Sequence, residues 1–411
     1  MRILYINPFS GFGGAEQSLV TLLLYLEKTT DYDLHLLLPD EGVLSEKLKN
    51  TSVKVHYLFP PSSFTSLSRV GLKGNFQLIL VFIQLLFTFP FYLFSLASFV
   101  KTIKPDVIHT NGIKSHVAAS LLPMSLAKIR LIWHWRIVPV NKMVRFVLSI
   151  LSHRIFMSIA NSKFTEKSVP VSAHLVKTVY NPIDCKRYSP VEFDYTGYEF
   201  LKDRIVISVV SVLAANKGVD TVISALAPLL NESDSYALVI VGDEIYETSG
   251  HQGYKTKLEE LAALVTTKEK VLFVGFQHDV NRWMSLAQVV VYFSEAESFG
   301  RVVAESLACK TPVVASAVGG IPEILEDGKT GFLIERDRES LNSLIDNLSL
   351  ETDNLPLVTD SLLLEKVKIL LNDHELRRKM GERGREFVME QFSVEQHGEG
   401  IKNIYEQNVN K

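Results

Sequence analysis

The sequence predicts two open α/β domains, each built on a parallel sheet, and three observations lead to this class. Short apolar runs alternate with helical patterns in two successive blocks, and strands joined through helices pair in parallel. A turn-forming cluster, Asn181-Pro182-Ile183-Asp184, separates the blocks. The balance of charge changes sign near the same point. A chain of 411 residues has room for two domains of ordinary size.

The first block, residues 1–185, begins with an apolar strand, a glycine-rich turn and a helix over Glu16–Lys28. A helix over residues 391–411 follows the end of the second block and is expected to cross back to the first domain. The strands expected in the first block are Arg2–Ile6, Asp33–Leu38, Val53–Leu58, Asp106–His109, Arg130–Trp133 and Ile155–Ile159.

The second block, residues 186–390, repeats the alternation of strands and helices without a fixed repeat period. Its expected strands are Val206–Leu213, Ala237–Val241, Val271–Val274, Val289–Phe293 and Pro312–Ser316.

Composition excludes several classes of protein. Hydrophobic residues at 47% and charged residues at 22% exclude a disordered chain. Cys185 and Cys309 are too few for a disulfide framework or a multi-cysteine zinc site, so a reducing cytoplasm is the expected location. The net charge of -3 conceals +9 in residues 1–185 and -12 in the remainder, which indicates an anionic partner for the first domain.

An uncharged apolar segment, Leu78–Val100, is long enough to span a bilayer at about 20 residues. A span there would separate strands of one sheet, so it is rejected. Two interpretations stay open: a buried crossover helix interrupted at Pro90, or a helix that packs on the sheet and presents an apolar face to a membrane interface. Lys101 and Lys104 flank the segment.

The stretch Arg130–Arg154 mixes Trp133 and Trp135 with basic residues, which favours contact with anionic lipid headgroups. Nucleic acid could use the same mixture. No helix-turn-helix, zinc-finger or RNA-recognition pattern is present, so we expect a peripheral association with the inner face of the membrane and no nucleic-acid partner.

Candidate ligand-binding residues follow several of the predicted strands. The turn around Gly13-Gly14 opens the first helix, either as an anion site or as a plain tight turn. In the second block, Lys217 and Gly242 follow strands, at the edge where open α/β sheets bind ligands. Phe299-Gly300 should begin a helix that places Glu305 on its second turn, where a carboxylate can accept both hydroxyls of a ribose. Each residue alone is more often structural, but several at successive strand ends favour a site.

With these residues the chain resembles glycosyltransferase family 4, whose members are retaining enzymes that use nucleotide sugars. Members of that family have the GT-B fold, in which two Rossmann-like parallel-sheet domains face a central cleft. The resemblance covers nearly the whole chain. It rests on Gly13-Gly14-Ala15-Glu16, Asp106-Val-Ile-His109, Asn181-Pro-Ile-Asp184, Lys217-Gly218, the pair Glu297 and Glu305 eight residues apart, Pro312-Val-Val, Gly319-Gly-Ile-Pro-Glu323, Asp327-Gly-Lys-Thr-Gly331 and the closing helices around Gly381–Phe392.

The resemblance implies roles for matching positions. Glu305 would hold the nucleotide ribose, Lys217 the diphosphate, and Glu297 the donor sugar. The remaining implied positions are the Phe299-Gly300-Arg301 backbone at the sugar, Gly242 in the donor site, Gly13 and Gly14 against the diphosphate, and His134 and Arg136 on the acceptor side. For His134 the alternative is a structural place between Trp133 and Trp135.

The implied activity is hexosyl transfer from a nucleoside diphosphate sugar to a hydroxyl, for a lipid-linked or cell-surface glycan precursor. No cofactor or metal is expected, since Lys217, backbone amides and a helix N-terminus can stabilise the leaving diphosphate. Catalysis would then depend on Lys217, Glu297 and His134.

Two positions depart from the family pattern. Val212 stands where an arginine is common, and Glu244 stands where a second glycine is usual. An active enzyme must replace the arginine, and Arg301 is the candidate, unless it only pairs with Glu305 one helical turn away. The departures keep a second hypothesis open: a non-catalytic protein that binds a nucleotide sugar or a partner. A nucleotide-sugar epimerase is a further possibility on this fold.

Overall fold

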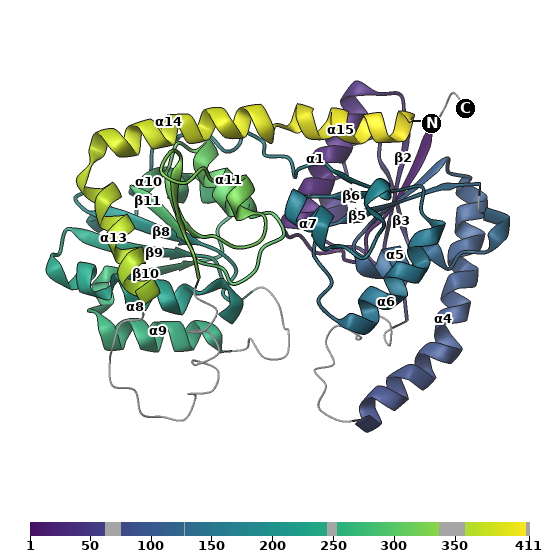
Figure 1. The fold of residues 1–411 in the computed structure, drawn as a ribbon, viewed down its shortest axis with the longest axis horizontal. Coiled ribbons are helices and arrows are strands. Elements are labelled where there is room, and N and C mark those ends of the chain that lie inside the picture. The colour runs from purple at the N-terminus through teal and green to yellow at the C-terminus, as the bar shows by residue number, and fades with distance from the viewer. Residues whose placement is uncertain (62–74, 127, 245–252, 337–357, 408–411) are drawn as a thin grey trace. The chain divides into compact units, whose positions relative to one another are not determined.

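The computed structural model of the chain describes residues 1–61, 75–126, 128–244, 253–336 and 358–407 (Figure 1). The chain divides into two compact units. The first comprises Met1–Pro182 and Phe392–Lys411, and the second comprises Ile183–Gln391. Each unit contains one parallel sheet, which confirms the predicted fold class.

The first unit is built on a seven-stranded sheet of order β3-β2-β1-β4-β5-β6-β7. Neighbouring strands pair in parallel throughout. The short strand β7 was not predicted from the sequence. The strands are β1 (Arg2–Ile6), β2 (Asp33–Leu38), β3 (Lys54–Tyr57), β4 (Val107–Asn111), β5 (Arg130–Trp135), β6 (Met157–Ala160) and β7 (Val176–Thr178).

Helices cover both faces of this sheet. Successive residues of β1 alternate between two hydrophobic clusters, because side chains of a strand point to opposite faces. Ile3 and Tyr5 pack in the cluster that includes α1 and α15, whereas Leu4 and Ile6 pack in the cluster that includes α4, α5 and α6. The helices of this unit are α1 (Gly14–Thr29), α2 (Val43–Glu46), α4 (Asn75–Ile103), α5 (Ile113–Ser120), α6 (Lys142–Leu151), α7 (Lys163–Ser168) and α15 (Val394–Glu406).

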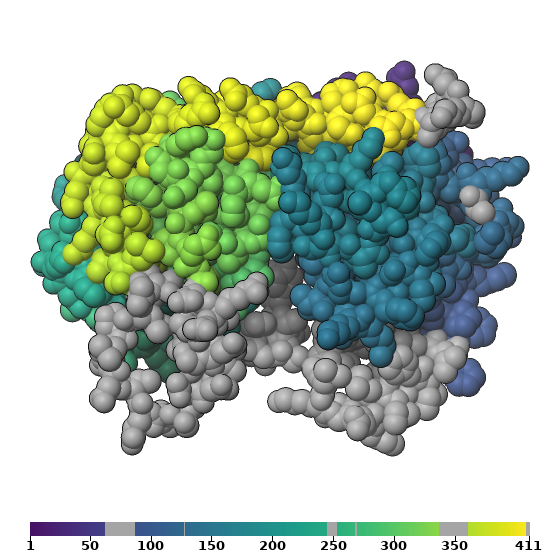
Figure 2. All heavy atoms as spheres, in the orientation of Figure 1, coloured from purple at the N-terminus to yellow at the C-terminus, as the bar shows by residue number. Residues whose placement is uncertain are grey.

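The helix α15 joins the first unit although it comes last in the chain. Its Tyr405 hydroxyl lies 2.8 Å from the Tyr5 hydroxyl, and its Tyr405 carbonyl accepts a hydrogen bond of 2.5 Å from Arg130. A Cβ on Gly398 would collide with the Tyr25 ring of α1, so this close helix packing requires glycine. In Figure 2 the atoms of α15 form part of the outer surface of this unit.

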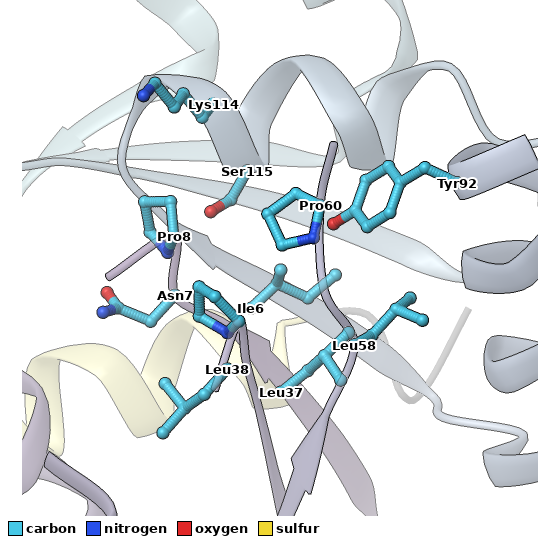
Figure 3. Close-up of a pocket in the computed structure, with 11 residues that line it drawn as sticks. Ile6, Asn7, Pro8, Leu37, Leu38, Leu58, Pro60, Tyr92, Lys114 and Ser115 are labelled. Carbon is cyan, nitrogen blue, oxygen red and sulfur yellow. The ribbon is translucent and has the colours of Figure 1, made fainter. Parts of the chain in front are cut away.

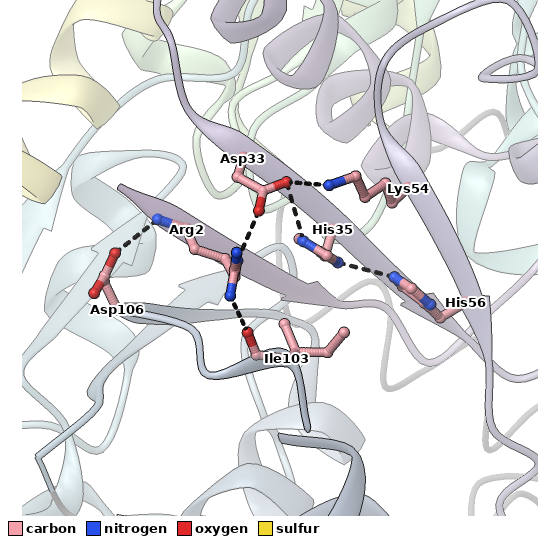
Figure 4. A network of polar contacts seen from close by, with 7 residues as sticks. All are labelled: Arg2, Asp33, His35, Lys54, His56, Ile103 and Asp106. Atoms are coloured by element: carbon pink, nitrogen blue, oxygen red, sulfur yellow. Dashed lines mark hydrogen bonds and ion pairs between the residues drawn. The ribbon is translucent and has the colours of Figure 1, made fainter. Parts of the chain in front are cut away.

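A polar network fastens the amino ends of the first strands (Figure 4). The Asp33 carboxylate accepts from Arg2 Nε at 2.7 Å and from Lys54 Nζ at 2.8 Å, and these two cations hold the pKa of Asp33 well below its usual range. His35 Nδ1 lies 2.9 Å from His56 Nε2 on the neighbouring strand. These charges lie at the sheet edge opposite the carboxyl ends of the strands, so they tie β1, β2 and β3 together and stay apart from the ligand-binding edge.

The apolar segment of the sequence forms most of α4. Its side chains before Phe87 lie outside the described residues. The helix continues through Pro90, contrary to the expected interruption, although the proline nitrogen cannot donate a hydrogen bond there. Leu96 and Val100 are fully buried in the core, so the crossover part of α4 packs on the sheet.

The second unit has a six-stranded parallel sheet of order β10-β9-β8-β11-β12-β13. Strand β13 was not predicted from the sequence. The elements are β8 (Ile205–Val210), β9 (Tyr236–Val241), β10 (Val271–Gly275), β11 (Val289–Tyr292), β12 (Val313–Ser316), β13 (Gly331–Ile334), α8 (Val219–Glu232), α9 (Tyr254–Val265), α10 (Val280–Leu286), α11 (Arg301–Ala308), α13 (Val358–Asn372) and α14 (His374–Gln391).

Three fully buried histidines make the first unit sensitive to acid. Burial lowers the pKa of His109 and His134 well below its ordinary value and lowers that of His116 to about 3. An unfolded chain binds protons at these groups near a pKa of about 6.5. Stability is therefore present above that value and is lost progressively as pH falls below it.

We expect backbone amides of β4 and β5 to lose hydrogen-exchange protection when pH falls from 7.5 to 5.0, after correction for the intrinsic exchange rate. Amides of β8 and β9 in the second unit serve as the internal control, because neither strand contains a histidine. Equal loss of protection in both sheets would contradict the assignment to buried histidines.

Candidate functional site

Three side chains meet at the carboxyl edge of the second sheet. Lys217 ends a short 3-10 turn after β8, and Glu297 lies in the loop after β11. Lys217 Nζ and the Tyr292 hydroxyl both contact Glu297 Oε1, and Lys217 Nζ lies 3.2 Å from the Tyr292 hydroxyl. Parallel strands bring their carboxyl ends to one edge, which is why residues 80 positions apart touch.

Tyr292 was missed by the sequence analysis because it ends an apolar strand. It is 5% exposed. Burial, followed by the nearby Glu297 carboxylate, raises the pKa of Tyr292 well above its ordinary value. The phenol therefore stays protonated and can donate to Glu297. Lys217 and Glu297 keep side-chain exposures of 21% and 15%, so a ligand can reach them.

The predicted helix after Phe299-Gly300 forms as α11. Gly300 has a φ of +104°, a left-handed conformation that favours glycine, and Phe299 is buried. Glu305 lies on the second turn with its side chain 7% exposed, and Arg301 NH2 donates to Glu305 Oε1 at 2.8 Å. Arg301 thus makes the intrahelical pair that was the alternative to a ligand contact, and the pair is buried rather than exposed.

Gly242 follows β9 at a place that admits no side chain. Its φ is +140°, and a Cβ would collide with the Ser211 carbonyl oxygen. Glu244, one of the two departures from the family pattern, lies two residues further on. Its carboxylate accepts a 2.7 Å hydrogen bond from the Lys255 amide in the first turn of α9. Asp243 pairs with the Lys255 ammonium at 3.1 Å. The strand end after β9 is therefore fixed by contacts to α9.

A basic residue that the sequence analysis did not select, Arg336, reaches the same edge. It follows β13, and its NH1 donates to the Phe293 carbonyl at 3.1 Å. Gly218 directly precedes α8. A Cβ added to Gly218 would lie 3.6 Å from the same Arg336 nitrogen, so the guanidinium is close to the N-terminus of α8. Its closest described carboxylate is Glu295, at 3.9 Å from NH2, and the Arg336 side chain is 14% exposed. A guanidinium thus lies next to the residue that follows Lys217.

In the first unit, the glycine turn leads directly into α1. The helix begins at Gly14, which is exposed. Gly13 N donates to Glu16 Oε2 at 3.1 Å, so the Glu16 side chain caps its own helix. Burial raises the pKa of Glu16, which is 7% exposed. Glu16 therefore has a structural role, and Gly14 remains open to a ligand.

His134 lies near the end of β5 and is fully buried. Its Nδ1 is 3.1 Å from His109 Nε2, and its Nε2 has no hydrogen-bond partner within the described ranges. The tryptophan cluster lies elsewhere: His116 stacks on Trp133 with ring centroids 5.1 Å apart. Because alternate residues of β5 point to opposite faces, the structural place between the two tryptophans belongs to His116.

Arg136 follows β5 and is 6% exposed. Its Nε donates to Asn111 Oδ1 at 2.7 Å and its NH1 to Asn181 Oδ1 at 2.5 Å. Asn111 in turn donates to Asn7 Oδ1 at 2.6 Å. The amide oxygens of Asn111 and Asn181 therefore hold this guanidinium at the carboxyl edge of the sheet, and its charge adds to burial in lowering the pKa of His134.

Two helices of the first unit expose apolar side chains. On α4, Phe91 and Phe94 are each 76% exposed. On α6, Met143 is 70% and Phe146 is 67% exposed, beside the exposed Lys142. Within the described parts of the chain, no helix is long and apolar enough to cross a membrane. The same residues contain no group of three His, Cys, Asp or Glu side chains that could hold a metal ion.

Known proteins resemble the chain in sequence and fold. Residues 195–356 match the family Glycosyl transferases group 1. N-acetyl-alpha-D-glucosaminyl L-malate synthase of Bacillus anthracis is 27% identical over 381 residues, which cover 88% of this chain and 91% of that relative. The gpi3 subunit of phosphatidylinositol N-acetylglucosaminyltransferase of Schizosaccharomyces pombe is 27% identical over 212 residues, or 51% of this chain and 42% of that subunit.

Among solved structures, HepE of Anabaena in complex with UDP-glucose superposes with a TM-score of 0.76 at 20% identity, over 98% of both chains. The fold is GT-B, with its two Rossmann-like units. The chain is a glycosyltransferase, and its second unit contains the match to the group 1 family. The predicted enzyme class is thereby confirmed, whereas the finer assignment to family 4 stays a prediction.

Proposed function

We propose that this glycosyltransferase moves a sugar of the hexosyl type from a nucleoside diphosphate sugar to a hydroxyl acceptor and retains the anomeric configuration. The contact of Lys217 and Tyr292 with Glu297 carries the proposal, since it gathers a cation and a carboxylate at the ligand edge of the group 1 domain. HepE, which shares the fold, was solved with UDP-glucose, and this supports a nucleotide sugar as the donor.

Each residue has a defined task in this proposal. Lys217 neutralises charge on the departing diphosphate, Glu305 accepts the ribose hydroxyls, and Glu297 binds the sugar. The bond from the anomeric carbon to the phosphate oxygen breaks, the acceptor oxygen bonds to that carbon on the same face, and the departing phosphate takes the acceptor proton. His134 and Arg136 belong to the acceptor side.

The leaving group needs no metal ion in this scheme. Lys217 supplies one positive charge, and the N-terminus of α11 adds the partial charge of its amides beside Gly300. We propose Arg336, rather than Arg301, as the second cation that replaces the arginine absent at Val212. Arg301 already pairs with Glu305, whereas Arg336 reaches the N-terminus of α8 next to Lys217.

A non-catalytic nucleotide-sugar binder is the second candidate, and Val212 is the observation that favours it. Glu244 no longer argues for lost activity, because its carboxylate holds the first turn of α9. Product analysis distinguishes these two candidates and the epimerase: a transferase forms a glycosylated acceptor, a binder leaves the nucleotide sugar intact, and an epimerase changes the sugar without an acceptor.

The glutamate pair provides the first test of the donor site. Glu305→Gln should weaken binding of free nucleoside diphosphate at least tenfold, because the amide loses one acceptor for the ribose hydroxyls. Glu297→Gln should leave that binding within twofold and lower turnover of the intact donor. Calorimetric titration with UDP and turnover of UDP-glucose measure both, with the exposed Glu259→Gln of α9 as the matched control. If both variants bind UDP and turn over UDP-glucose as the parent does, the assignment of Glu305 and Glu297 to the donor site is wrong.

Arg336 provides the second test. Arg336→Ala should reduce turnover roughly 100-fold, by comparison with deletion of one oxyanion donor. Adding Val212→Arg should recover part of the loss, because it restores a cation after β8, at the carboxyl edge of the same sheet. The control is Arg383→Ala on α14, whose side chain is 47% exposed. If Arg336→Ala turns over donor as the parent does, Arg336 is not the second cation.

We further propose that the first unit docks on the inner, cytoplasmic face of a membrane, with a lipid-linked acceptor. The exposed phenylalanines of α4 and the exposed apolar side of α6 supply the hydrophobic contact, and the net charge of +9 in residues 1–185 supplies attraction to anionic lipid. The phosphatidylinositol named in the gpi3 relative supports a lipid acceptor in this fold class.

Flotation with vesicles tests the docking. The chain should float with phosphatidylglycerol vesicles at low salt and less at high salt, because salt screens the charge attraction. Phe91→Ser with Phe94→Ser should reduce flotation severalfold. Phe276→Ser on the second unit, 54% exposed in the parent, is the control. Absence of flotation, or equal flotation with neutral vesicles, would exclude this surface.

A further inference from the structure

Tyrosine hydroxyls lie near the carboxyl edge of both sheets, in different surroundings. In the first unit, Tyr92 lines a small pocket together with Leu37, Leu58 and Pro60 (Figure 3). The pocket has about 20 Å³ of space for the centre of a water molecule, which is room for one water. Burial raises the pKa of Tyr92 to about 12. In the second unit, the Tyr292 hydroxyl meets charged groups instead of an apolar wall.

Tyr292 is the last residue of β11, and its side chain points away from the main hydrophobic cluster of the second unit. Val291 and Phe293 pack in that cluster, so Tyr292 lies on the opposite face of the strand. Its ring is buried, and Lys217 Nζ lies 5.7 Å from the ring centroid. The hydroxyl lies 3.2 Å from the same nitrogen and contacts Glu297 Oε1. A buried hydroxyl therefore joins both members of the ion pair.

The chemistry of these three groups sets the direction of each hydrogen bond. An ammonium only donates, and an ionised carboxylate only accepts. Tyr292 therefore accepts from Lys217 Nζ and donates its own proton to Glu297 Oε1. Burial, followed by the Glu297 carboxylate, raises the pKa of Tyr292 well above its ordinary value, so the proton stays on the phenol. Lys217 and Tyr292 both donate to Oε1, which leaves the lone pairs of Oε2 for a ligand.

The two donors would respond differently to a bound diphosphate. The Lys217 side chain is partly exposed, and a diphosphate would compete with Glu297 for its ammonium. The Tyr292 phenol is neutral and buried, and it belongs to a strand, so an anion does not draw it away. A partly buried carboxylate that loses one donor needs another to stay in place. Of the two donors, only Tyr292 stays at Oε1 once the ammonium has turned to the diphosphate.

We propose that Tyr292 is a positioning residue, which holds the Glu297 carboxylate in place when a donor diphosphate takes Lys217. The inference rests on the proposed function, in which Lys217 binds the diphosphate and Glu297 the sugar. Tyr292 itself touches neither. Its hydroxyl sets how strongly the site prefers an intact nucleoside diphosphate sugar to the free nucleoside diphosphate, because only the intact donor presents a sugar to Glu297.

Tyr292→Phe tests this role, because it keeps the ring and removes only the hydroxyl. The kcat/KM for UDP-glucose should fall about tenfold, as expected for the loss of one hydrogen bond to a charged group. Calorimetric titration should show UDP affinity within twofold of the parent, because the hydroxyl contacts no part of the nucleotide. Tyr236→Phe is the matched control, since Tyr236 is partly buried and begins β9 at the amino edge of the same sheet.

A double-mutant cycle separates positioning from packing. In the Glu297→Ala background, Tyr292→Phe should lower kcat/KM by less than a further twofold, because the hydroxyl acts through the carboxylate. An equal tenfold loss in both backgrounds would overturn the proposal. So would a parent-like Tyr292→Phe beside an impaired Glu297→Ala, and that result would leave the proposed function intact. Tenfold weaker UDP binding by Tyr292→Phe would assign the hydroxyl to Lys217 instead. If Glu297→Ala turns over UDP-glucose as the parent does, the proposed role of Glu297 fails and this inference fails with it.

Discussion

Parallel pairing of the strands is the constraint on which both sites depend. When every strand of a sheet runs the same way, all carboxyl ends share one edge, and the loops that leave them converge there. Lys217, Glu297 and Arg336 come from the ends of β8, β11 and β13, and no local pattern joins them. The close approaches at Gly242 and Gly218 follow from the same crowding, since backbone from neighbouring loops fills the space of a side chain. In the first sheet, the opposite edge carries the Asp33 network, in which Arg2 and Lys54 share one carboxylate.

Buried polar groups give the two units different characters. In the first unit, neutral histidines and amides surround Arg136, so its interior tolerates one fixed positive charge without an abundance of acids. In the second unit, each of two carboxylates at the ligand edge has a cationic partner. Removing one partner from such a pair leaves the other charge uncompensated, which costs more than the pair contributes.

The sequence was sufficient for the order of most elements and for placing Lys217 and Glu297 at one edge of the second sheet. The strands Arg2–Ile6 and Asp33–Leu38 match their predicted bounds, because buried parallel strands are continuous apolar runs. Tyr292 could not be selected, since an aromatic residue at the end of such a run is indistinguishable from core. Arg336 follows a four-residue strand that begins with glycine and carries little signal.

The contact between Arg301 and Glu305 bears on how the donor is held. A carboxylate offers roughly four lone-pair positions on two oxygens, and Arg301 uses one of them on Oε1. Oε2 therefore keeps its capacity for the two hydroxyls of a ribose, while the guanidinium fixes the rotamer. Arg301 is then a positioning residue, which acts through Glu305. In the proposed function Lys217 differs, because a bound diphosphate would compete directly with Glu297 for its ammonium. Donor binding would then weaken that ion pair, and the freed Glu297 carboxylate would become available to the sugar hydroxyls. The pair would thus couple recognition of the diphosphate to recognition of the sugar.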